Sequence, residues 1–326
     1  MTRLATVYGG SGFIGRYIVQ RLAHAGWRVR VAVRRPNEAL FVRTYGVVGQ
    51  VEPVLCNVRD DASVRSVMGS ADAVVNCVGI LNEVGRNRFG PVQADGPRRI
   101  ARIAAEEGVG QFVHISAIGA DSNSPSAYAR SKAEGEGGVL EHFPQALILR
   151  PSIVFGPEDG FFNRFAGMAQ MSPILPMVGA NTRFQPVYVE DVAQAAVKGV
   201  LGQARPGIYE LGGPEVKTFR ELMRDMLAVI GRRRLMVNVP FPVAAAMGGA
   251  LDVAQFITGG LFENRLLTRD QVRNLRRDNV VGAQMRGLAD LGITPTPMEG
   301  VLPEYLWRFR PTGQYAAIKA SARDVR

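Results

Sequence analysis

The chain has 326 residues, enough for one large α/β domain or two smaller ones, and 47% of them are hydrophobic, as in proteins with a full core. The formal net charge of +10 is spread over both halves of the chain, whereas nucleic-acid-binding proteins usually concentrate basic residues on one stripe or tail, so no nucleic-acid partner is expected. No apolar run reaches the length of about 20 residues that a membrane-spanning helix needs. The cysteines and histidines lack metal-ligand spacing, so no metal site is expected.

Apolar runs and helical patterns alternate from the start of the chain. The apolar runs predict strands at 4–8, 29–33, 51–56, 73–77, 111–115 and 146–149, and helical spacing is clearest at 13–25, 97–107 and 128–140. Continuous apolar strands separated by helices are typical of a parallel sheet covered on both faces. Residues 1–150 are therefore predicted to form a Rossmann-type, doubly wound α/β domain. Because the first strand leads directly into a glycine motif, no signal or transit peptide is expected.

The pattern loosens in the second half of the chain. Glycine and proline become frequent after residue 151, the apolar runs shorten, and helical patterns predominate towards the end. Residues 151–326 are predicted to form a smaller, mostly helical C-terminal lobe. The boundary between the two parts is soft, because such lobes often return strands to the main sheet.

A glycine motif joins the first strand to the first helix, with the sequence Gly9-Gly10-Ser11-Gly12-Phe13-Ile14-Gly15. In this context Gly9 permits a tight turn, Gly12 lets the backbone approach a pyrophosphate, and Gly15 lets the helix pack closely on the strand. The helix N-terminus then directs free N–H groups and the positive end of its dipole at the phosphates. The motif therefore predicts a dinucleotide-binding site.

Two arginines, Arg34 and Arg35, follow the second strand, where an NAD-specific site usually has an acidic residue that binds the ribose 2′-hydroxyl. Guanidinium groups would bind a 2′-phosphate, so NADPH or NADP⁺ is expected, unless both arginines are simply exposed surface residues. Asn57 and Val58 follow the third strand and are expected near the adenine. Val78 and Gly79 follow the fourth and are expected to line the cofactor cleft.

The Gly-x-x-Gly-x-x-Gly spacing resembles the short-chain dehydrogenase/reductase superfamily, as does the pair Tyr128 and Lys132, which lie on one face of a predicted helix. The resemblance implies that Tyr128 is an acid/base, that Lys132 lowers its pKa and binds the nicotinamide ribose, and that Ser116 polarises a carbonyl. The loop between Ser116 and Tyr128 is shorter than in active extended members. Catalysis and simple retention of the ribose are therefore both open roles for the pair.

Longer segments resemble one atypical family, the nucleotide-binding accessory subunit of respiratory complex I in its bacterial form. They are residues 75–81, 149–159, 161–165, 185–193, 267–272 and 305–310, of which Leu149-Arg150-Pro151-Ser152-Ile153-Val154-Phe155-Gly156-Pro157 is the most distinctive. The resemblance implies an NADPH held tightly without turnover, with Pro151 and Ile153 beside the nicotinamide. It also implies a supporting role among other subunits near the quinone site, peripheral on the cytoplasmic face of the bacterial inner membrane. Asn57 departs from the Asp of many relatives.

An apolar segment at 235–262 has two interpretations. Val243, Met247, Leu251, Ala254 and Ile257 can share one helix face, and basic clusters at 232–234 and 265–277 flank the segment. The segment is either an ordinary packed helix or a contact with a membrane surface or a neighbouring subunit. Likewise, the basic excess is either a solvated surface or an attraction to anionic lipid or an acidic protein.

The sequence as a whole favours an NADPH-binding accessory subunit of NADH:quinone oxidoreductase. One alternative is a free NADP-dependent reductase or nucleotide-sugar epimerase that uses Tyr128, Lys132 and Ser116. Another is a regulator whose partner binding depends on the redox state of the cofactor.

Overall fold

Seven parallel strands form the main sheet of the computed structural model, which describes residues 3–258, 264, 267–311 and 313. In the order β11-β6-β5-β4-β1-β2-β3, they are Gly207–Leu211, Leu147–Pro151, Gln111–Ile115, Ala73–Asn76, Leu4–Tyr8, Arg28–Val33 and Val51–Leu55. All the strands predicted from apolar runs are present, and the doubly wound parallel sheet is confirmed. The strand order reverses beside β1, which pairs with both β2 and β4. Ligands of such sheets bind at the carboxyl ends of the strands at this point.

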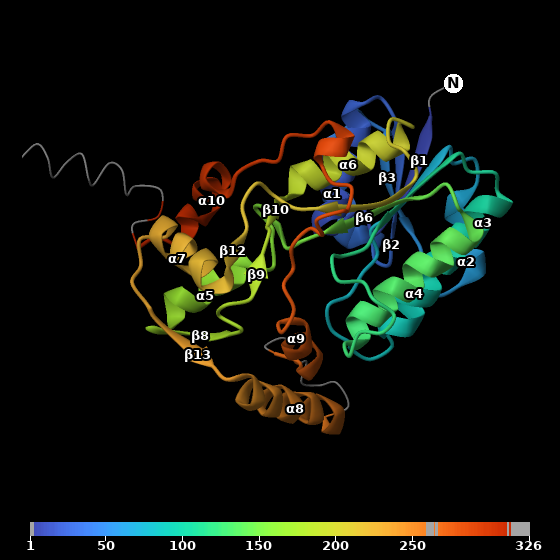
Figure 1. Ribbon diagram of the computed structural model, residues 1–326. Helices are drawn as coiled ribbons and strands as arrows, with labels where there is room; N and C mark the ends of the chain where they lie inside the picture. The colour runs from blue at the N-terminus through green and yellow to red at the C-terminus, as the bar shows by residue number, and fades with distance from the viewer. Residues whose placement is uncertain (1–2, 259–263, 265–266, 312, 314–326) are drawn as a thin grey trace, which may run out of the picture.

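Helices cover both faces of the sheet (Figure 1). α1 (Phe13–His24) and α6 (Val189–Val200) share one hydrophobic cluster with it, and α2 (Asp61–Met68), α3 (Asp95–Glu106) and α4 (Ala127–His142) lie against the other face. The 3₁₀ segment η1 (Pro36–Tyr45) packs with α1 on the first face, and the π-helical turn η2 (Gly90–Ala94) packs with α3 and α4 on the second. Side chains on adjacent strand positions enter opposite clusters, as the period of a strand requires: Val7 packs towards α1, and Tyr8 towards α2.

The second half of the chain completes the sheet. β11 pairs with β6 in register from Gly207 opposite Leu147 to Leu211 opposite Pro151. α6 approaches closely because Gly199 has no side chain, and a Cβ there would lie 2.5 Å from the Leu147 Cδ2 atom. Residues beyond 150 thus supply an edge strand and a covering helix to the sheet that residues 1–150 build.

The C-terminal lobe has its own aromatic core, and its mostly helical character is confirmed. Phe161, Phe165 and Phe219 pack against one another within it, with ring centroids 5.2 to 5.7 Å apart. Three two-stranded pairs, β7–β10, β9–β12 and β8–β13, link the helices. The elements are β7 (Val154–Phe155), α5 (Phe162–Met171), β8 (Ile174–Val178), β9 (Arg183–Phe184), β10 (Val187–Tyr188), β12 (Lys217–Thr218), α7 (Phe219–Val229), β13 (Leu235–Val239), α8 (Phe241–Ile257), α9 (Arg269–Asn274), η3 (Ala289–Leu291), α10 (Met298–Leu306) and η4 (Trp307–Phe309).

Two features of the described residues bear on function. None of the helices in this part of the chain combines the length and apolar content that a bilayer crossing requires. Its His, Cys, Asp and Glu side chains nowhere gather in a group of three or more that could hold a metal ion.

Candidate dinucleotide site

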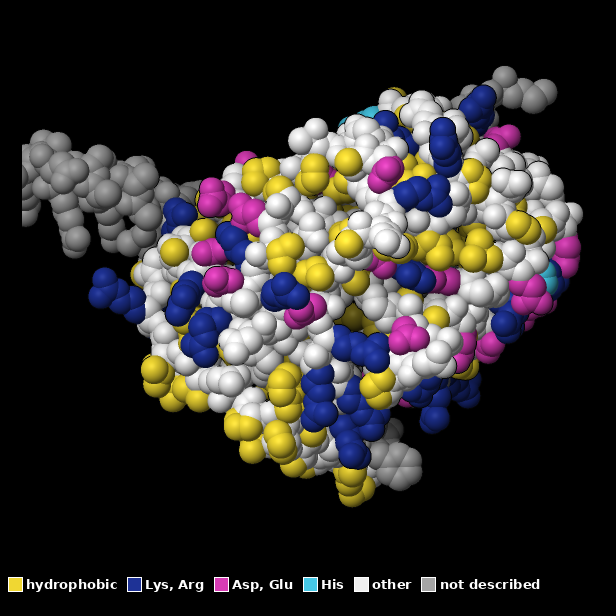
Figure 2. Space-filling model, viewed as in Figure 1, with side chains coloured by type: hydrophobic (Ala, Val, Ile, Leu, Met, Phe, Trp, Pro, Cys, Tyr) yellow, Lys and Arg dark blue, Asp and Glu magenta, His cyan; other side chains and the backbone are white. Residues whose placement is uncertain are grey.

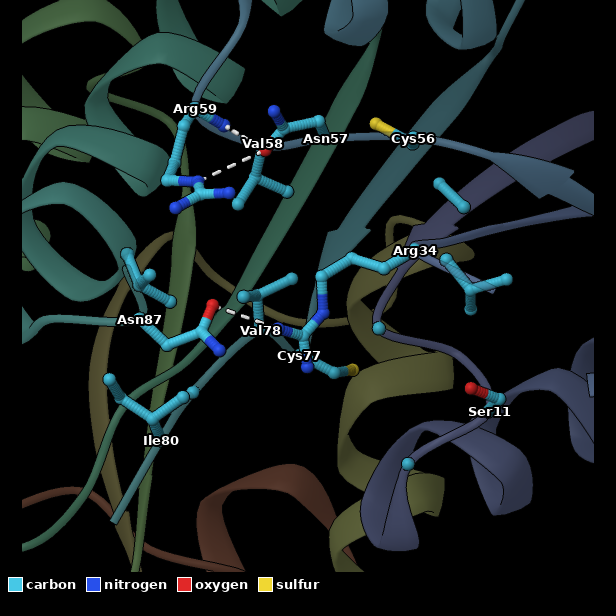
Figure 3. A pocket seen from close by; sticks show the side chains of 16 residues that line it. Ser11, Arg34, Cys56, Asn57, Val58, Arg59, Cys77, Val78, Ile80 and Asn87 are labelled. Atoms are coloured by element: carbon cyan, nitrogen blue, oxygen red, sulfur yellow. Dashed lines mark hydrogen bonds between the residues drawn. The ribbon is translucent and has the colours of Figure 1, made fainter. Parts of the chain in front are cut away.

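A cleft lies at the carboxyl ends of β1, β2, β3 and β4, where the strand order reverses (Figure 3). Backbone and small side chains of the glycine motif form one wall, and residues that follow the neighbouring strands form the others. The lining residues are Gly9, Ser11, Gly12, Ala32, Val33, Arg34, Cys56, Asn57, Val58, Arg59, Cys77, Val78, Gly79, Ile80, Asn87 and Val92. The glycine motif, Arg34, Asn57, Val58, Val78 and Gly79 were all expected here.

The glycine motif folds into a tight cradle. Gly9 has a φ of +74°, and its N–H donates to the Ala32 carbonyl oxygen at 2.9 Å. A Cβ on Gly15 would overlap the Gly9 carbonyl oxygen and lie 2.7 Å from the Gly10 Cα atom, so only glycine allows α1 to pack this closely. No side chain caps the N-terminus of α1 at Gly12. Its first N–H groups therefore face the cleft as donors for an anion.

Phe13 and Ile14 are outside the cleft lining, and a contact of their backbone N–H groups with the cofactor remains a prediction. The Phe13 ring packs edge-on against Tyr17, 6.2 Å between centroids, and Ile14 packs on the core of the sheet. Their side chains hold the first turn of α1 in place, while its N–H groups remain directed at the cleft.

The side chains of the two arginines after β2 lie in different places. Arg34 extends into the cleft, where its Nη1 donates to the Asn87 Oδ1 atom at 2.8 Å (Figure 3). Arg35 is outside the cleft lining, is largely exposed, and pairs with Glu38 at 3.0 Å. Of the pair, Arg34 is therefore the one positioned to meet a 2′-phosphate.

Arg59 lines the cleft together with Arg34 and was not expected there. Its Nε donates to the Asn57 Oδ1 atom at 3.2 Å, and its Nη1 donates to the Arg86 carbonyl oxygen at 2.8 Å. Within the described residues, neither Arg34 nor Arg59 forms an ion pair with a carboxylate. Because Asn57 is neutral, it orients Arg59 without cancelling its charge. The position of Arg59 just past the end of the third strand was the available signal.

The other half of the site lies past β4 and β5. Ser116 is buried, and its hydroxyl is among the described side-chain atoms that lack a hydrogen-bond partner. The Lys132 Nζ donates to the Ile115 carbonyl oxygen at 3.4 Å and lies 6.0 Å from the centroid of the Tyr128 ring. A Cβ on Gly79 would lie 3.3 Å from this Nζ, so the lysine directly adjoins the cleft. The unpartnered Ser116 hydroxyl fits a site built for a polar ligand group.

Burial changes the titration of the Tyr128–Lys132 pair. It raises the pKa of Tyr128 to about 12. It also lowers the pKa of Lys132 to about 8, against the opposing attraction of Glu136 and Cys77. At neutral pH the phenol is therefore fully protonated and the lysine is mostly charged. Both can donate hydrogen bonds to ribose hydroxyls, but Tyr128 is a poor base in this state.

Residues of the C-terminal lobe hold α4 and the loop beside it. The Asp270 carboxylate accepts from the Ser126 hydroxyl at 2.7 Å and from the Ala127 and Tyr128 N–H groups at 2.8 and 3.1 Å. Gln271 donates to the Asn82 side chain at 2.7 Å, in the loop that leads to Asn87. Asp270 thus satisfies the first turn of the helix that carries Tyr128 and Lys132, a contact between residues 142 positions or more apart that local sequence could not reveal.

Pro151 and Ile153 diverge in their surroundings. The Ser116 N–H donates to Leu149 and the Ile118 N–H to Pro151, at 2.7 and 3.0 Å, so Pro151 lies beside the Ser116 loop. Ile153 packs against the aromatic core of the C-terminal lobe, and its carbonyl accepts from the Val187 N–H at 2.9 Å. A contact of Pro151 and Ile153 with the nicotinamide remains a prediction.

Comparison with known proteins identifies the family. The sequence pattern of the NAD dependent epimerase/dehydratase family matches residues 5–212. The chain belongs to this family. Its fold is also that of an Escherichia coli NADPH-dependent quinone oxidoreductase complexed with NADPH, at a TM-score of 0.70 and 18% identity, over 93% of this chain and 98% of the other.

Two kinds of relative are prominent among the curated proteins that match this epimerase/dehydratase-family chain. One is NADH dehydrogenase (ubiquinone) 1 alpha subcomplex subunit 9, mitochondrial. The Arabidopsis thaliana protein is 34% identical over 95% of this chain and 79% of its own length, and the Mus musculus protein is 32% identical over 94% and 80%. The other is the ceramide reductase of Caulobacter vibrioides, 31% identical over 78% of this chain and 79% of its own length. The first kind of similarity includes nearly all of the C-terminal lobe.

The lowered pKa of Lys132 predicts a pH dependence for this family member. If the ammonium donates to the ribose of bound NADPH, binding raises the pKa of Lys132, and the complex binds more protons than the free chain above about pH 8. NADPH affinity should therefore fall as pH rises through 8, by at most about tenfold per pH unit. Calorimetry at pH 8 in buffers of different ionisation enthalpy should detect proton uptake, and Lys132→Met should abolish it. Equal uptake by the variant would exclude Lys132 as the titrating group.

Proposed function

We propose that this chain is an NADPH-binding accessory subunit of NADH:quinone oxidoreductase, without turnover of its own. The observation that carries the proposal is the 34% identity to subunit 9 of the mitochondrial enzyme, because it spans both the sheet and the C-terminal lobe. The raised pKa of Tyr128 supports it, since a phenol protonated at neutral pH suits retention of a ligand better than proton abstraction.

Two groups of residues offer contacts for the two halves of NADPH. The glycine motif and the N-terminus of α1 would hold the pyrophosphate, Arg34 and Arg59 the 2′-phosphate, and Asn57 and Val58 the adenine. A second group, at the ends of β4, β5 and β6, would hold the nicotinamide ribose and ring through Lys132, Tyr128, Ser116 and Pro151. Bound NADPH supplies hydride chemistry in enzymes of this fold.

The role proposed for the cofactor is structural. A ligand present at about 100 times its Kd adds about 2.7 kcal/mol to the stability of the folded state. The cleft joins elements distant in sequence, from Gly9 to Asn87, and Gly79 connects it to Lys132 on α4. An occupied cleft would therefore stabilise the sheet together with α4 and the loop that α9 contacts. The proposal includes a peripheral position near the quinone site, on the cytoplasmic face of a bacterial inner membrane.

A native gel tests this proposal. Membranes from cells with a tagged copy would be solubilised gently, separated, stained for NADH dehydrogenase activity and probed for the tag. Comigration with a large active complex that withstands salt is expected. A tag found only as a small soluble species would refute the accessory-subunit role.

Replacement of Tyr128 by phenylalanine distinguishes a role in cofactor retention from a role in catalysis. We expect unchanged NADH:quinone reductase activity and nearly unchanged assembly, because in the proposed role the phenol transfers no proton and donates only one of the hydrogen bonds that would hold the ribose. Membranes of the Tyr128→Phe strain would be assayed for both. Lys132→Met is the paired variant, and it should weaken cofactor retention and lower the amount of assembled subunit. Slower quinone reduction by Tyr128→Phe in a fully assembled complex would contradict the non-catalytic role.

The second candidate is a free NADP-dependent reductase. It is favoured by the ceramide reductase similarity and by the retained Ser116, Tyr128 and Lys132. Such an enzyme would appear in the soluble fraction, exchange its cofactor readily and consume NADPH with a carbonyl substrate. Loss of that consumption in Tyr128→Phe would establish this role and exclude the structural one.

A further inference from the structure

Helix α8 is apolar around most of its circumference, yet one side of it is uncovered. Val243, Met247, Val253 and Ile257 are 50%, 53%, 56% and 76% exposed, and Ala246 and Ala250 lie between them on the same side. Their spacing of three and four residues makes one continuous stripe, which we call the α8 face. A helix apolar on nearly all sides is normally covered, so this face requires an occupant.

The opposite side of α8 is fixed to the protein by α9. Gly248 lets the chains approach, since a Cβ there would lie 2.9 Å from the Arg269 nitrogen. Asp252 is the one acidic residue of α8, and its carboxylate accepts from the Arg269 N–H at 3.0 Å on this inner side. Phe241 lies under the Arg276 guanidinium, 5.3 Å from the ring centroid. The α8 face is therefore held outward and bears no charge.

Arginines of α9 and of the residues just after it lie beside α8. Arg269, Arg273, Arg276 and Arg277 are all exposed, and Figure 2 shows basic side chains gathered directly beside the apolar lower edge of the molecule, where Figure 1 has α8 and α9. Arg269 and Arg276 pair with no carboxylate among the described residues, whereas Arg277 pairs with Asp121 at 3.0 Å. The expected basic cluster at 265–277 also includes Arg265, which lies outside the described residues.

The uncovered apolar surface continues beyond α8 on the β8–β13 pair. Ile174, Leu235 and Val237 are 47%, 64% and 40% exposed, and Ile174 is the register partner of Leu235. β13 leads directly into α8, and the β8–β13 pair and α8 lie along the same edge of the molecule in Figure 1. Three further arginines, at 232–234, precede β13.

We propose that the α8 face and the α9 arginines bind the surface of an anionic lipid bilayer, with the α8 face in the interface and the arginines at the headgroups. The exposed stripe is aliphatic and offers no side-chain hydrogen-bonding group or large aromatic ring, whereas the cores of protein interfaces are enriched in aromatic residues and carry hydrogen bonds. Positive charge lies beside it on α9 and the residues just after, and three further arginines precede β13 in sequence. Apolar burial combined with attraction to anionic headgroups is the pairing that holds interfacial helices on membranes. This binding surface goes beyond the proposed function, because it requires no other subunit.

The test uses the purified full-length chain and a flotation assay. Vesicles would contain phosphatidylcholine alone or an equal mixture with phosphatidylglycerol. The chain is expected to float with the mixed vesicles, less so at high salt, and poorly with phosphatidylcholine alone. Met247→Glu/Val253→Glu should weaken binding at least about tenfold, and Arg269→Gln/Arg276→Gln on the order of twentyfold.

Matched variants control for charge and hydrophobicity alone. Val47→Glu/Val48→Glu changes exposed apolar residues elsewhere, and Arg28→Gln/Arg43→Gln removes the same charge far from α8 in sequence; neither should alter flotation. Unchanged melting temperatures would show that all four variants fold. The proposal is wrong if the wild-type chain does not float, or if the α8 and control variants behave alike. It is also wrong if the α8 variants float normally but no longer comigrate with the respiratory complex, which would make the face a protein interface. Normal flotation without comigration in the native gel would instead refute only the proposed function.

Discussion

Replacement of Gly15 by alanine is expected to destabilise the chain by between about 1 and 3 kcal/mol and to weaken NADPH binding at least about tenfold. The added Cβ would overlap the Gly9 carbonyl oxygen and lie 2.7 Å from the Gly10 Cα atom. Both are backbone atoms of the cradle, so α1 must move away from β1 to make room. That movement withdraws the N–H groups at the start of α1 from the pyrophosphate position. Urea unfolding and calorimetric titration would measure the two effects.

Gly137→Ala is the matched control for this substitution. Gly137 lies within α4, and a Cβ there would meet no atom within 4 Å. Alanine in an exposed helical position is favoured over glycine, so this variant should gain about 0.5 to 1 kcal/mol. If Gly15→Ala were as stable as the wild type and bound NADPH normally, the cradle would not depend on the close approach of α1.

The Arg34→Ala variant should lose the preference for NADPH over NADH. A hydrogen bond to a charged group contributes about 1.5 to 3 kcal/mol, so NADPH affinity should fall by on the order of 10- to 100-fold. NADH has no 2′-phosphate, and its affinity should change by no more than about twofold. The structural reason is that Arg34 enters the cleft beside Arg59, with no described carboxylate paired to either. Titration with both dinucleotides measures the preference directly.

Arg35→Ala separates this effect from a general loss of surface charge. Arg35 carries the same charge on the adjacent residue, but its guanidinium is outside the cleft lining and pairs with Glu38. This variant should bind both dinucleotides as the wild type does. If Arg34→Ala weakened the binding of NADPH and NADH equally, Arg34 would contact a part common to the two cofactors. A preference for NADPH would then depend on Arg59 alone or would not exist.

The local sequence was sufficient to predict the elements of the main sheet and one wall of the cleft. Strand runs such as Ala73 to Val75 are apolar on both faces because both faces are covered, and a short window of sequence is enough to show this. The glycine motif predicted its own geometry because Gly9 has a positive φ and a Cβ on Gly15 would overlap the Gly9 carbonyl oxygen, so both constraints arise within the motif. Arg34 was identifiable for the same reason, since it directly follows a strand whose end lies at the switch point.

Contacts between distant segments decided the rest. The separation of Arg34 from Arg35 depends on Asn87, which holds one guanidinium in the cleft while Glu38 holds the other outside. Arg59 joins the site because β3 ends next to β2, and Asp270 supports Tyr128 because α9 packs at the start of α4.

The uncovered side of α8 shows most clearly what the local sequence determines and what the tertiary structure decides. Its sequence is equally consistent with a packed helix and an exposed one, because apolar residues occur at nearly every position. The tertiary structure selects which side α9 covers, through Gly248 and Asp252, and so leaves the α8 face outward. Hydrophobic periodicity and short motifs determined which elements form and where a phosphate site is predicted, since both arise within a few residues. The neighbours of each side chain were decided by packing between segments far apart in the chain, for which a single sequence carries no local signal.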